Sequence, residues 1–589
     1  MVNYGVSSVA LWLLSLLSYL SFSKGYDSKD IRVNCGRIFI ASLYVLLIQA
    51  VEASSIFSMQ WIWSLVIGTS WIVVIPVLQY ISYNAPNIDG ASCIDSSREI
   101  VFGIYSMSIL HVLGIILPKF FVPKFIGVAV LYVVFMIFML IPLLYIMHYI
   151  MYNTTPSEPA VKAIQETYLA ESVEYIKTYS KNGKILFAMS ILLLISAIFI
   201  ADNYESYRFS MEYDYYFCGE IVILLVGCIL IKDCFRKLRI YNVYINIASR
   251  RKNDKEYKKY AGTRQIKVDK KMAMPFVLPG TVILIIGESA SRDYMHIYHE
   301  AIPYENTPWM EKMKKEEKVE IFTNAYACYN QTSEVLKRVL TEMSQYNNVA
   351  FKDAASIIEM ARAVGYKTYW FSNQGSISCD DSAEALIANM SDVVYGIGDT
   401  RKAKYDHSML DLLDKVDEKE NNFIIFHLKG SHGQYKLRYP KDFARWPSDN
   451  EETAYHNTLL YTDDFLCKLY NKAAQKFNLQ AMLYFSDHGD NLKYGHHPDI
   501  RTADTVRIPM FILLSEQYKR QFSQKYEQLQ MHSHSYFSND MMYNTVMGLL
   551  NIKSERYDSS EDLTSDDYAY GDENTLTFLG DVRAADYDK

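Results

Sequence analysis

Histidines and aspartates crowd the segment AMLYFSDHGDNLKYGHHPD, residues 481–499. The segment begins with an apolar, partly aromatic run that predicts a buried strand, and the polar DHGD that follows predicts the turn leaving it. A single Asp-His-Gly in a loop is most often a solvated, structural feature. Imidazoles and carboxylates gathered after one strand instead favour metal-binding chemistry, which open α/β sheets place at the carboxyl ends of their strands.

Two further polar residues follow predicted strands or begin predicted helices. Glu288 comes directly after the apolar run VILIIG, and Thr332 in ACYNQTSEV lies at a loop-to-helix junction. Each has a structural alternative, because a glutamate at a helix N-terminus interacts with the helix dipole and a threonine can cap the helix. For either residue alone the structural alternative is the better interpretation.

The argument for chemistry therefore rests on the whole set of strand-end residues. The set comprises Glu288, Thr332, His432, Asp487, His488, His496 and His497. A zinc ion takes about four nitrogen and oxygen ligands of this mixture and can hold a reacting oxygen in an open position. A threonine hydroxyl, a poor nucleophile by itself, is activated by such coordination.

These residues need a scaffold that brings separate strand ends together. Between about residues 277 and 552, short apolar runs such as TVILIIGES, YKTYWFSNQG, NFIIFHLKG and IPMFILLS alternate with longer amphipathic stretches. This alternation predicts a mostly parallel sheet covered by helices on both faces.

The first 235 residues have a different character. Long apolar segments lie at residues 6–22, 38–51, 61–81, 104–117, 125–151, 185–200 and 216–231. We expect about five to seven membrane-spanning helices, the first of them an anchor and not a cleaved signal peptide. The expected organisation is a transmembrane domain at 1–235, a basic linker or interfacial helix at 236–275, a catalytic domain at 276–553 and a loosely packed acidic tail at 554–589.

Charge and cysteine content exclude some classes of function. The net charge of -7 argues against a nucleic-acid partner, since no basic face dominates the C-terminal half. The eight cysteines show no Cys-x-x-Cys spacing, so neither a thiolate zinc site nor a dense disulfide framework is indicated.

Five segments in one order resemble the motif series of a known family. GESASRD, ACYNQTSEV, GSHGQYKLRYP, NTLLYTDDFL and YFSDHGD look like those of the phosphoethanolamine transferases, membrane-anchored members of the alkaline phosphatase and sulfatase superfamily. The resemblance implies a multi-span helical membrane domain followed by an α/β/α sandwich.

The resemblance also implies roles for individual residues. Zinc would be held by Glu288, Asp487, His488 and the nucleophile Thr332. The phosphoryl group would lie between His432 and a second histidine, for which His496 aligns best and His497 is the alternative. Asn457, in NTLLYTDDFL, would contact the substrate.

The implied reaction moves phosphoethanolamine from phosphatidylethanolamine to a lipopolysaccharide or other glycan or lipid acceptor through a phosphothreonine. It would occur at the bacterial inner membrane with the catalytic domain in the periplasm, although the basic stretch 232–271 would by the positive-inside tendency favour the cytoplasm. The lipid A enzymes of the family carry a second cysteine soon after the nucleophile, whereas this chain has Leu336, Lys337 and Arg338 there. Lipid A is therefore the less favoured acceptor.

Two alternatives remain at this stage. A phosphoglycerol transferase or phosphodiesterase would use the same residues on a different donor. An inactive membrane scaffold would keep the zinc fold without turnover. Sulfate ester hydrolysis is disfavoured, because CYNQTSE lacks the Cys/Ser-x-Pro-x-Arg setting of sulfatases.

Overall fold

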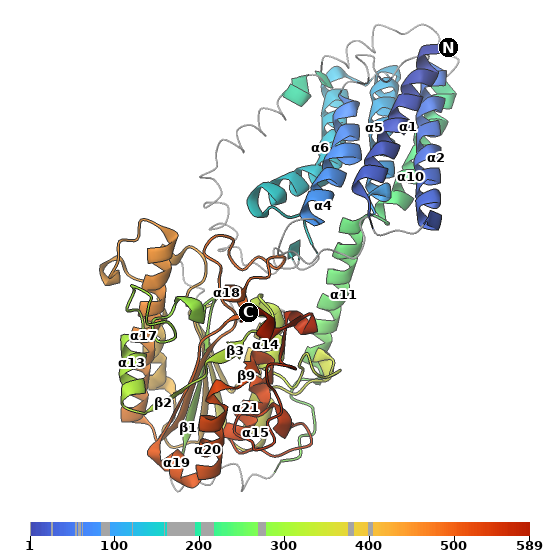
Figure 1. Cartoon of the computed structure of the whole chain (residues 1–589). Coiled ribbons are helices and arrows are strands. Elements are labelled where there is room, and N and C mark those ends of the chain that lie inside the picture. The colour runs from blue at the N-terminus through green and yellow to red at the C-terminus, as the bar shows by residue number, and fades with distance from the viewer. Residues whose placement is uncertain are drawn as a thin grey trace. The chain divides into compact units, whose positions relative to one another are not determined.

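The computed structural model describes residues 2–24, 28–52, 56, 61, 63–83, 95–120, 122–157, 160–161, 195–198, 200–201, 217–268, 279–374, 382–397 and 405–588. The chain forms two compact units, which divide between Ala248 and Ser249 (Figure 1). Each unit has its own hydrophobic core.

The N-terminal unit is helical. Its helices are α1 (Val2–Phe22), α2 (Ser28–Glu52), α3 (Ser64–Thr69), the π-helical turn η2 (Ser70–Val74), α4 (Ile75–Tyr83), α5 (Ser97–Lys119), α6 (Lys124–Tyr152) and α10 (Phe217–Phe235). Five segments are long and apolar enough to cross a membrane. They are Gly5–Phe22, Ser28–Glu52, Ser64–Tyr83, Ser97–Lys119 and Lys124–Ile150.

The two remaining apolar segments of the sequence are not among these five. The segment at residues 185–200 lies largely outside the described residues. The segment at residues 216–231 falls within α10, whose length is sufficient but which carries Glu220, Lys232 and Asp233. The described residues thus support the lower end of the expected range.

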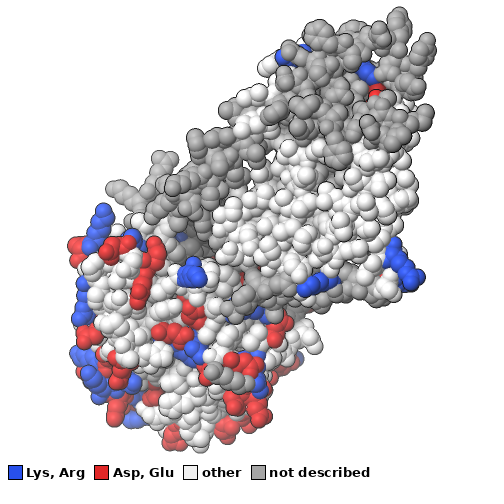
Figure 2. All heavy atoms as spheres, turned by 45° about the horizontal axis from the view of Figure 1, so that its top comes forward, with Lys and Arg blue, Asp and Glu red and all other residues white. Residues whose placement is uncertain are grey.

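Helix α5 forms the centre of the N-terminal unit, where it contacts α2, α3, α6 and α10. Two of its ionisable groups form ion pairs, which lowers the cost of placing charge inside a membrane: His111 lies 2.7 Å from Glu52, and Lys119 lies 2.8 Å from Glu220. Figure 2 shows charged side chains spread over the surface of the C-terminal unit and few on the described atoms of the N-terminal one. This distribution fits a membrane domain followed by a water-exposed domain.

The basic segment expected to be a linker is largely a helix, α11 (Arg239–Tyr260). The end of this helix packs into the C-terminal unit, where the Tyr257 ring stacks on Phe351 at 4.4 Å between centroids. A few residues later, Arg264 forms an ion pair with Glu359 at 2.9 Å, and both side chains are almost fully buried. The chain is therefore anchored on the catalytic unit before its sheet begins.

A mixed sheet forms the middle layer of the C-terminal unit. Its strands, in spatial order, are β2 (Val319–Ile321), β8 (Met510–Leu514), β7 (Leu479–Ser486), β1 (Thr281–Gly287), β6 (Asn422–His427), β4 (Lys367–Ser372) and β5 (Val393–Gly396). The pairs from β7 to β5 are parallel, whereas β8 is antiparallel to both of its neighbours, β7 and β2, so β8 alone runs against the other strands. The small pairs β3 (Asn324–Tyr326) with β9 (Tyr536–Ser538) and β10 (Leu576–Thr577) with β11 (Val582–Arg583) lie outside it.

Helices cover both faces of this sheet (Figure 1). One face carries α14 (Thr332–Val339), α15 (Ile357–Ala363), α16 (Ala383–Ala388), α20 (Ser523–Met531) and α21 (Met542–Leu549), and the other carries α13 (Pro308–Lys315) and α17 (Glu451–Lys476). The short helices α18 (Ala503–Val506) and α19 (Glu516–Gln521) flank β8 in the chain. The expected combination of a helical membrane domain and an α/β/α sandwich is confirmed.

The acidic C-terminal segment differs from the expectation of a loosely packed tail. Leu563, Phe578 and Ala584 are each at most 1% exposed and belong to the core on the α14 face of the sheet. The carboxylate of Asp588 accepts hydrogen bonds from the hydroxyls of Tyr326 and Tyr536. A few apolar residues are enough to hold this segment in place, because their side chains insert into the core of the C-terminal unit.

Candidate active site

Two central strands present their last residues side by side. In the parallel register of β1 and β7, Gly287 pairs with Ser486, so Glu288 and Asp487 leave the sheet at the same edge. Glu288, Asp487 and His488 are all buried, and one ligand atom from each lies within 4.8 Å of the others. This is the one group of histidine, cysteine and acidic side chains with metal-binding spacing in the described part of the chain.

Thr332 is placed against this group by α14. The helix begins at Thr332 and its N-cap is Gln331, so the threonine does not have the capping role that its position in the sequence allowed. Its Oγ1 lies 3.2 Å from Nε2 of His488 and 3.4 Å from Oε2 of Glu288. The structure thus brings together all four residues expected to surround a metal.

The hydrogen bonds of the triad leave its ligand atoms directed inward. Nδ1 of His488 lies 2.8 Å from the carbonyl oxygen of Gly489, which can only accept, so Nδ1 carries the proton and Nε2 presents a lone pair. Oδ1 of Asp487 accepts from the backbone N–H groups of Ser289 and His488. Its Oδ2 is buried with no hydrogen-bond partner.

The triad itself supplies no positive charge to compensate its two carboxylates. Burial raises the pKa of Glu288 to about 7, and the neighbouring Asp487 carboxylate adds to the rise. Burial also raises the pKa of Asp487, while it lowers the pKa of His488 to about 4. Two buried carboxylates beside a neutral imidazole and an unsatisfied oxygen fit a divalent cation such as zinc, which would keep both acids ionised.

Glu288 is held by residues that the sequence did not single out. Its Oε1 accepts from the Ser289 hydroxyl at 2.7 Å, and its Oε2 accepts from the Gln374 amide at 3.2 Å. Gln374 follows β4. For its segment, YKTYWFSNQG, the sequence predicts a strand and gives no sign of a role in the site. Gly430 has φ +48, and a Cβ there would lie 2.7 Å from the Glu288 carbonyl oxygen, so only glycine fits this approach.

The expected helix after Glu288 is absent from the structure. Arg292–Tyr294 forms a single 3-10 turn, η4, and the backbone of Ser289 has a left-handed φ of 56°. The Tyr455 hydroxyl holds this turn, donating to the Ser289 carbonyl and accepting from the Ser291 N–H. Glu288 therefore does not lie at a helix N-terminus, and the dipole interpretation of this residue does not apply.

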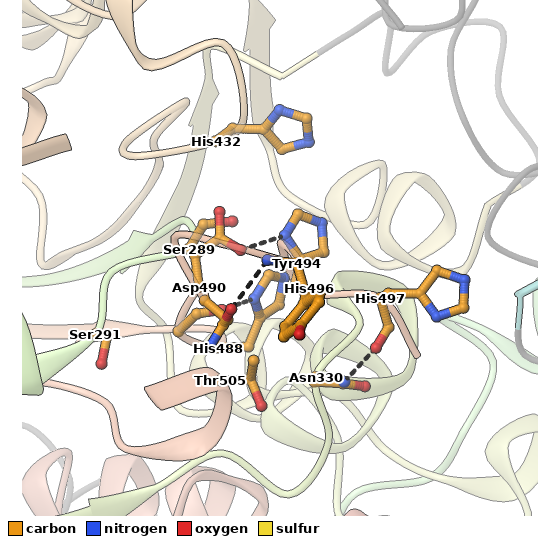
Figure 3. Close-up of polar contacts among 12 residues, drawn as sticks. Ser289, Ser291, Asn330, His432, His488, Asp490, Tyr494, His496, His497 and Thr505 are labelled. Carbon is orange, nitrogen blue, oxygen red and sulfur yellow. Dashed lines mark hydrogen bonds and ion pairs between the residues drawn. The ribbon is translucent and has the colours of Figure 1, made fainter. Parts of the chain in front are cut away.

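The structure distinguishes between the two candidate histidines after the Asp-His pair. The ring of His496 lies 4.6 Å from that of His488 and 5.8 Å from that of His432, measured between centroids. Figure 3 shows His496 beside His488 and His497 pointing away from this cluster. His497 lies 3.9 Å from Asp499, and its carbonyl accepts from Asn330.

Opposite electrostatic surroundings act on His432 and His496. Burial lowers the pKa of His432 well below its usual value, and Lys429 and Arg438 lower it further. Burial lowers the pKa of His496 as well, but Asp490 and the nearby acids outweigh it and raise the pKa to about 9. At neutral pH the site thus offers one neutral and one protonated imidazole for a phosphoryl group.

Asn457 was expected to contact the substrate, and the structure gives its amide another role. Its Oδ1 accepts from the backbone N–H groups of Arg445 and Trp446, and its Nδ2 donates to the Trp446 carbonyl oxygen. The side chain is fully buried on α17. Asn457 fixes the loop before α17, and none of its hydrogen bonds joins it to the triad or to the two site histidines.

A domain family and several curated proteins resemble this chain. The sulfatase family model matches residues 280–552, the part of the chain that contains the sheet and the site. Phosphoethanolamine transferase EptC of Escherichia coli K12 is 28% identical over 278 residues, which are 42% of this chain and 48% of that protein. Phosphoethanolamine transferase CptA of Salmonella typhimurium is 25% identical over 320 residues, 49% of this chain and 53% of that protein.

This chain also resembles solved protein structures. The periplasmic domain of EptC from Escherichia coli in complex with zinc gives a TM-score of 0.48 at 23% identity, covering 54% of this chain and 95% of that one. The matched region spans about half the length of the curated relatives. Fold and site define a membrane-anchored protein with a sulfatase-type domain. The curated relatives that the chain resembles within that class are phosphoethanolamine transferases.

Proposed function

We propose that this protein is a zinc-dependent phosphoethanolamine transferase that takes the group from phosphatidylethanolamine and passes it to a lipopolysaccharide or another glycan or lipid acceptor. The observation that carries the proposal is the position of the Thr332 hydroxyl. It lies within 3.4 Å of both Glu288 and His488, beside a buried oxygen of Asp487 that has no hydrogen-bond partner. The names of the relatives support the transferred group.

The proposed residue roles follow from this geometry. Glu288, Asp487, His488 and Thr332 would hold the zinc, which when bound would favour the ionised threonine oxygen. Thr332 Oγ1 gives its proton to solvent and attacks phosphorus, the bond from phosphorus to the glycerol oxygen breaks, and that oxygen takes up a proton to give diacylglycerol. An acceptor hydroxyl then attacks the phosphothreonine and loses its proton, the bond from phosphorus to Thr332 Oγ1 breaks, and Thr332 takes up a proton.

The two site histidines would serve the phosphoryl group. His496, protonated at neutral pH, can neutralise charge on the phosphoryl oxygens and supply the proton that the leaving oxygen needs. His432, held neutral by its surroundings, can accept the proton of the attacking acceptor hydroxyl. Each step removes a proton from an attacking hydroxyl and adds one to a leaving oxygen, so one neutral and one protonated histidine can supply the base and the acid that the reaction needs.

The donor can be identified by incubating the purified full chain with phospholipids of defined headgroup. With phosphatidylethanolamine and no acceptor, we expect diacylglycerol release and a protein heavier by one phosphoethanolamine unit, because Thr332 retains the group when nothing accepts it. Intact-mass spectrometry measures the adduct, and peptide fragmentation locates it.

Phosphatidylglycerol serves as the matched donor control, since it differs only in the headgroup alcohol. A phosphoglycerol adduct formed preferentially from this lipid would replace our proposal with a phosphoglycerol transferase. Hydrolysis of both lipids without any adduct would indicate a phosphodiesterase, and zinc binding without reaction would indicate an inactive scaffold.

The proposed donor and acceptor place the catalytic unit outside the cytoplasm, at the inner membrane. An alkaline phosphatase reporter fused to the C-terminus should therefore be active, whereas a green fluorescent protein fused there should be dark when exported unfolded. Fluorescence without phosphatase activity would contradict the proposed location. The basic helix α11 makes this test worthwhile, because the positive-inside tendency alone favours the opposite orientation.

A further inference from the structure

The loop after β7 contains a buried acid that the proposed chemistry has not used. Asp490 is 1% exposed, and its two carboxylate oxygens bind side chains from two different segments. Oδ1 lies 3.3 Å from Nδ1 of His496, and Oδ2 accepts from the Tyr435 hydroxyl at 2.7 Å. Figure 3 shows Asp490 and His496 together at the centre of the histidine cluster.

The backbone of this loop is shaped to return His496 to Asp490. Gly495 has φ +65, and a Cβ at this position would lie 3.7 Å from Oδ1 of Asp490. The turn is closed by the Gly495 N–H, which donates to the Asn491 carbonyl at 2.7 Å. The Gln331 amide donates to the His496 carbonyl, so the residue before the nucleophile also fixes this backbone.

Tyr435, the second partner of Asp490, belongs to the loop that carries His432. Tyr435 follows His432 in the same loop, and its ring packs edge-on against Tyr455 at 4.9 Å between centroids. Tyr455 holds the turn after Glu288 through its hydroxyl. Asp490 therefore connects the loop of His496 to the loop of His432 and, through packing, to the segment that carries Glu288.

We propose that Asp490 is a positioning residue that fixes the His496 ring through Nδ1 and leaves Nε2 to act on the phosphoryl group. A carboxylate can only accept a hydrogen bond, so its contact keeps a proton on Nδ1 and fixes how the ring is rotated. The contact with Tyr435 keeps the carboxylate itself in place. The role in transfer rests on the proposed function, whereas the placement of the ring does not.

Asp490→Ala should lower kcat for transfer by roughly 10- to 100-fold, the usual effect of losing a hydrogen-bond partner of a site histidine. The KM for phosphatidylethanolamine should stay within about twofold, because the residue does not touch the lipid. The decisive comparison is a double-mutant cycle with His496→Ala. If Asp490 acts through His496, the double variant is no slower than His496→Ala alone.

Two variants separate positioning from a general structural effect. Asp490→Asn keeps an oxygen that can accept from Nδ1, so it should retain more activity than Asp490→Ala. If Asp490→Ala does not fold, Asp490→Asn takes its place in the double-mutant cycle. Asp463→Asn is the matched control: Asp463 is also buried, but it accepts from the backbone of Trp309 and Met310 at the start of α13. This control should lose thermal stability and keep the kcat of the folded protein.

A structure of the Asp490 variant by electron cryomicroscopy, determined with the full chain, tests the inference without any substrate. We expect the His496 ring to leave its position beside His488 while Glu288, Asp487 and His488 stay in place. An unmoved ring, or losses that multiply in the double variant, would overturn the positioning role. Wild-type protein that transfers nothing from phosphatidylethanolamine would instead refute the proposed function, and the ring position would still decide the inference.

Discussion

Replacing Thr332 by alanine should abolish transfer while the protein stays folded. The missing oxygen is the atom that bonds to phosphorus, and loss of a catalytic nucleophile commonly lowers kcat by about 10,000-fold or more. The change in the free energy of unfolding should be under about 1 kcal/mol, since Thr332 is only partly buried and Gln331 is the N-cap of α14. Intact-mass spectrometry should show no phosphoethanolamine adduct on this variant.

Two comparisons make the Thr332 result specific. Thr332→Ser should retain part of the activity, because it keeps the oxygen and loses only the methyl group that restricts the rotamer. Ser515→Ala removes a true N-cap, whose hydroxyl accepts from the Tyr518 N–H, and should cost about 1 kcal/mol of stability without affecting transfer. Transfer by Thr332→Ala, or an adduct on another residue of the wild type, would remove Thr332 from the mechanism.

Replacing Glu288 or Asp487 by alanine should remove zinc and activity together. Each variant deletes a charged ligand, so we expect zinc affinity to fall by more than the roughly 10- to 100-fold typical of losing an outer-shell partner. Metal content of the purified protein and isothermal titration with zinc measure this loss independently of turnover. Asp562→Ala, at a buried acid that bonds Tyr557 and Thr564, is the matched control and should keep its zinc.

Replacing Glu288 by glutamine should raise the stability of the metal-free protein at alkaline pH. The pKa of Glu288 is raised to about 7, so the folded state binds its proton more tightly than the unfolded state and loses stability as pH rises from about 4.5 to 7. After chelation at pH 8, Glu288→Gln should therefore melt at a higher temperature than wild type, with little difference at pH 4. With zinc bound, the order at pH 8 should reverse. The same order with and without zinc would argue against a metal at Glu288.

The sequence alone was sufficient for the architecture of the catalytic unit. Runs such as VILII and AMLYF are apolar throughout, and a strand buried on both faces is the structure that tolerates this pattern. Five of the apolar N-terminal segments are long enough to identify as spans from composition. These features are local, so periodicity and length suffice to detect them.

Tertiary structure decided which residues share the site and which do not. Glu288, Thr332 and His488 are distant in sequence, and only the pairing of β1 with β7 and the start of α14 bring their ligand atoms together. The resemblance favours His496 over the adjacent His497 without excluding either, whereas the turn at Gly495 directs only the first toward His488.

Supporting residues were the least accessible to sequence analysis. Gln374 and Tyr455 form hydrogen bonds with partners far along the chain, Asp490 contacts both Tyr435 and His496, and Asn457 stands in a matching motif yet binds the loop before α17. The physical reason is the same in each case. Burial patterns are properties of a short segment, whereas a hydrogen bond depends on atoms placed within about 3 Å of each other by the whole fold.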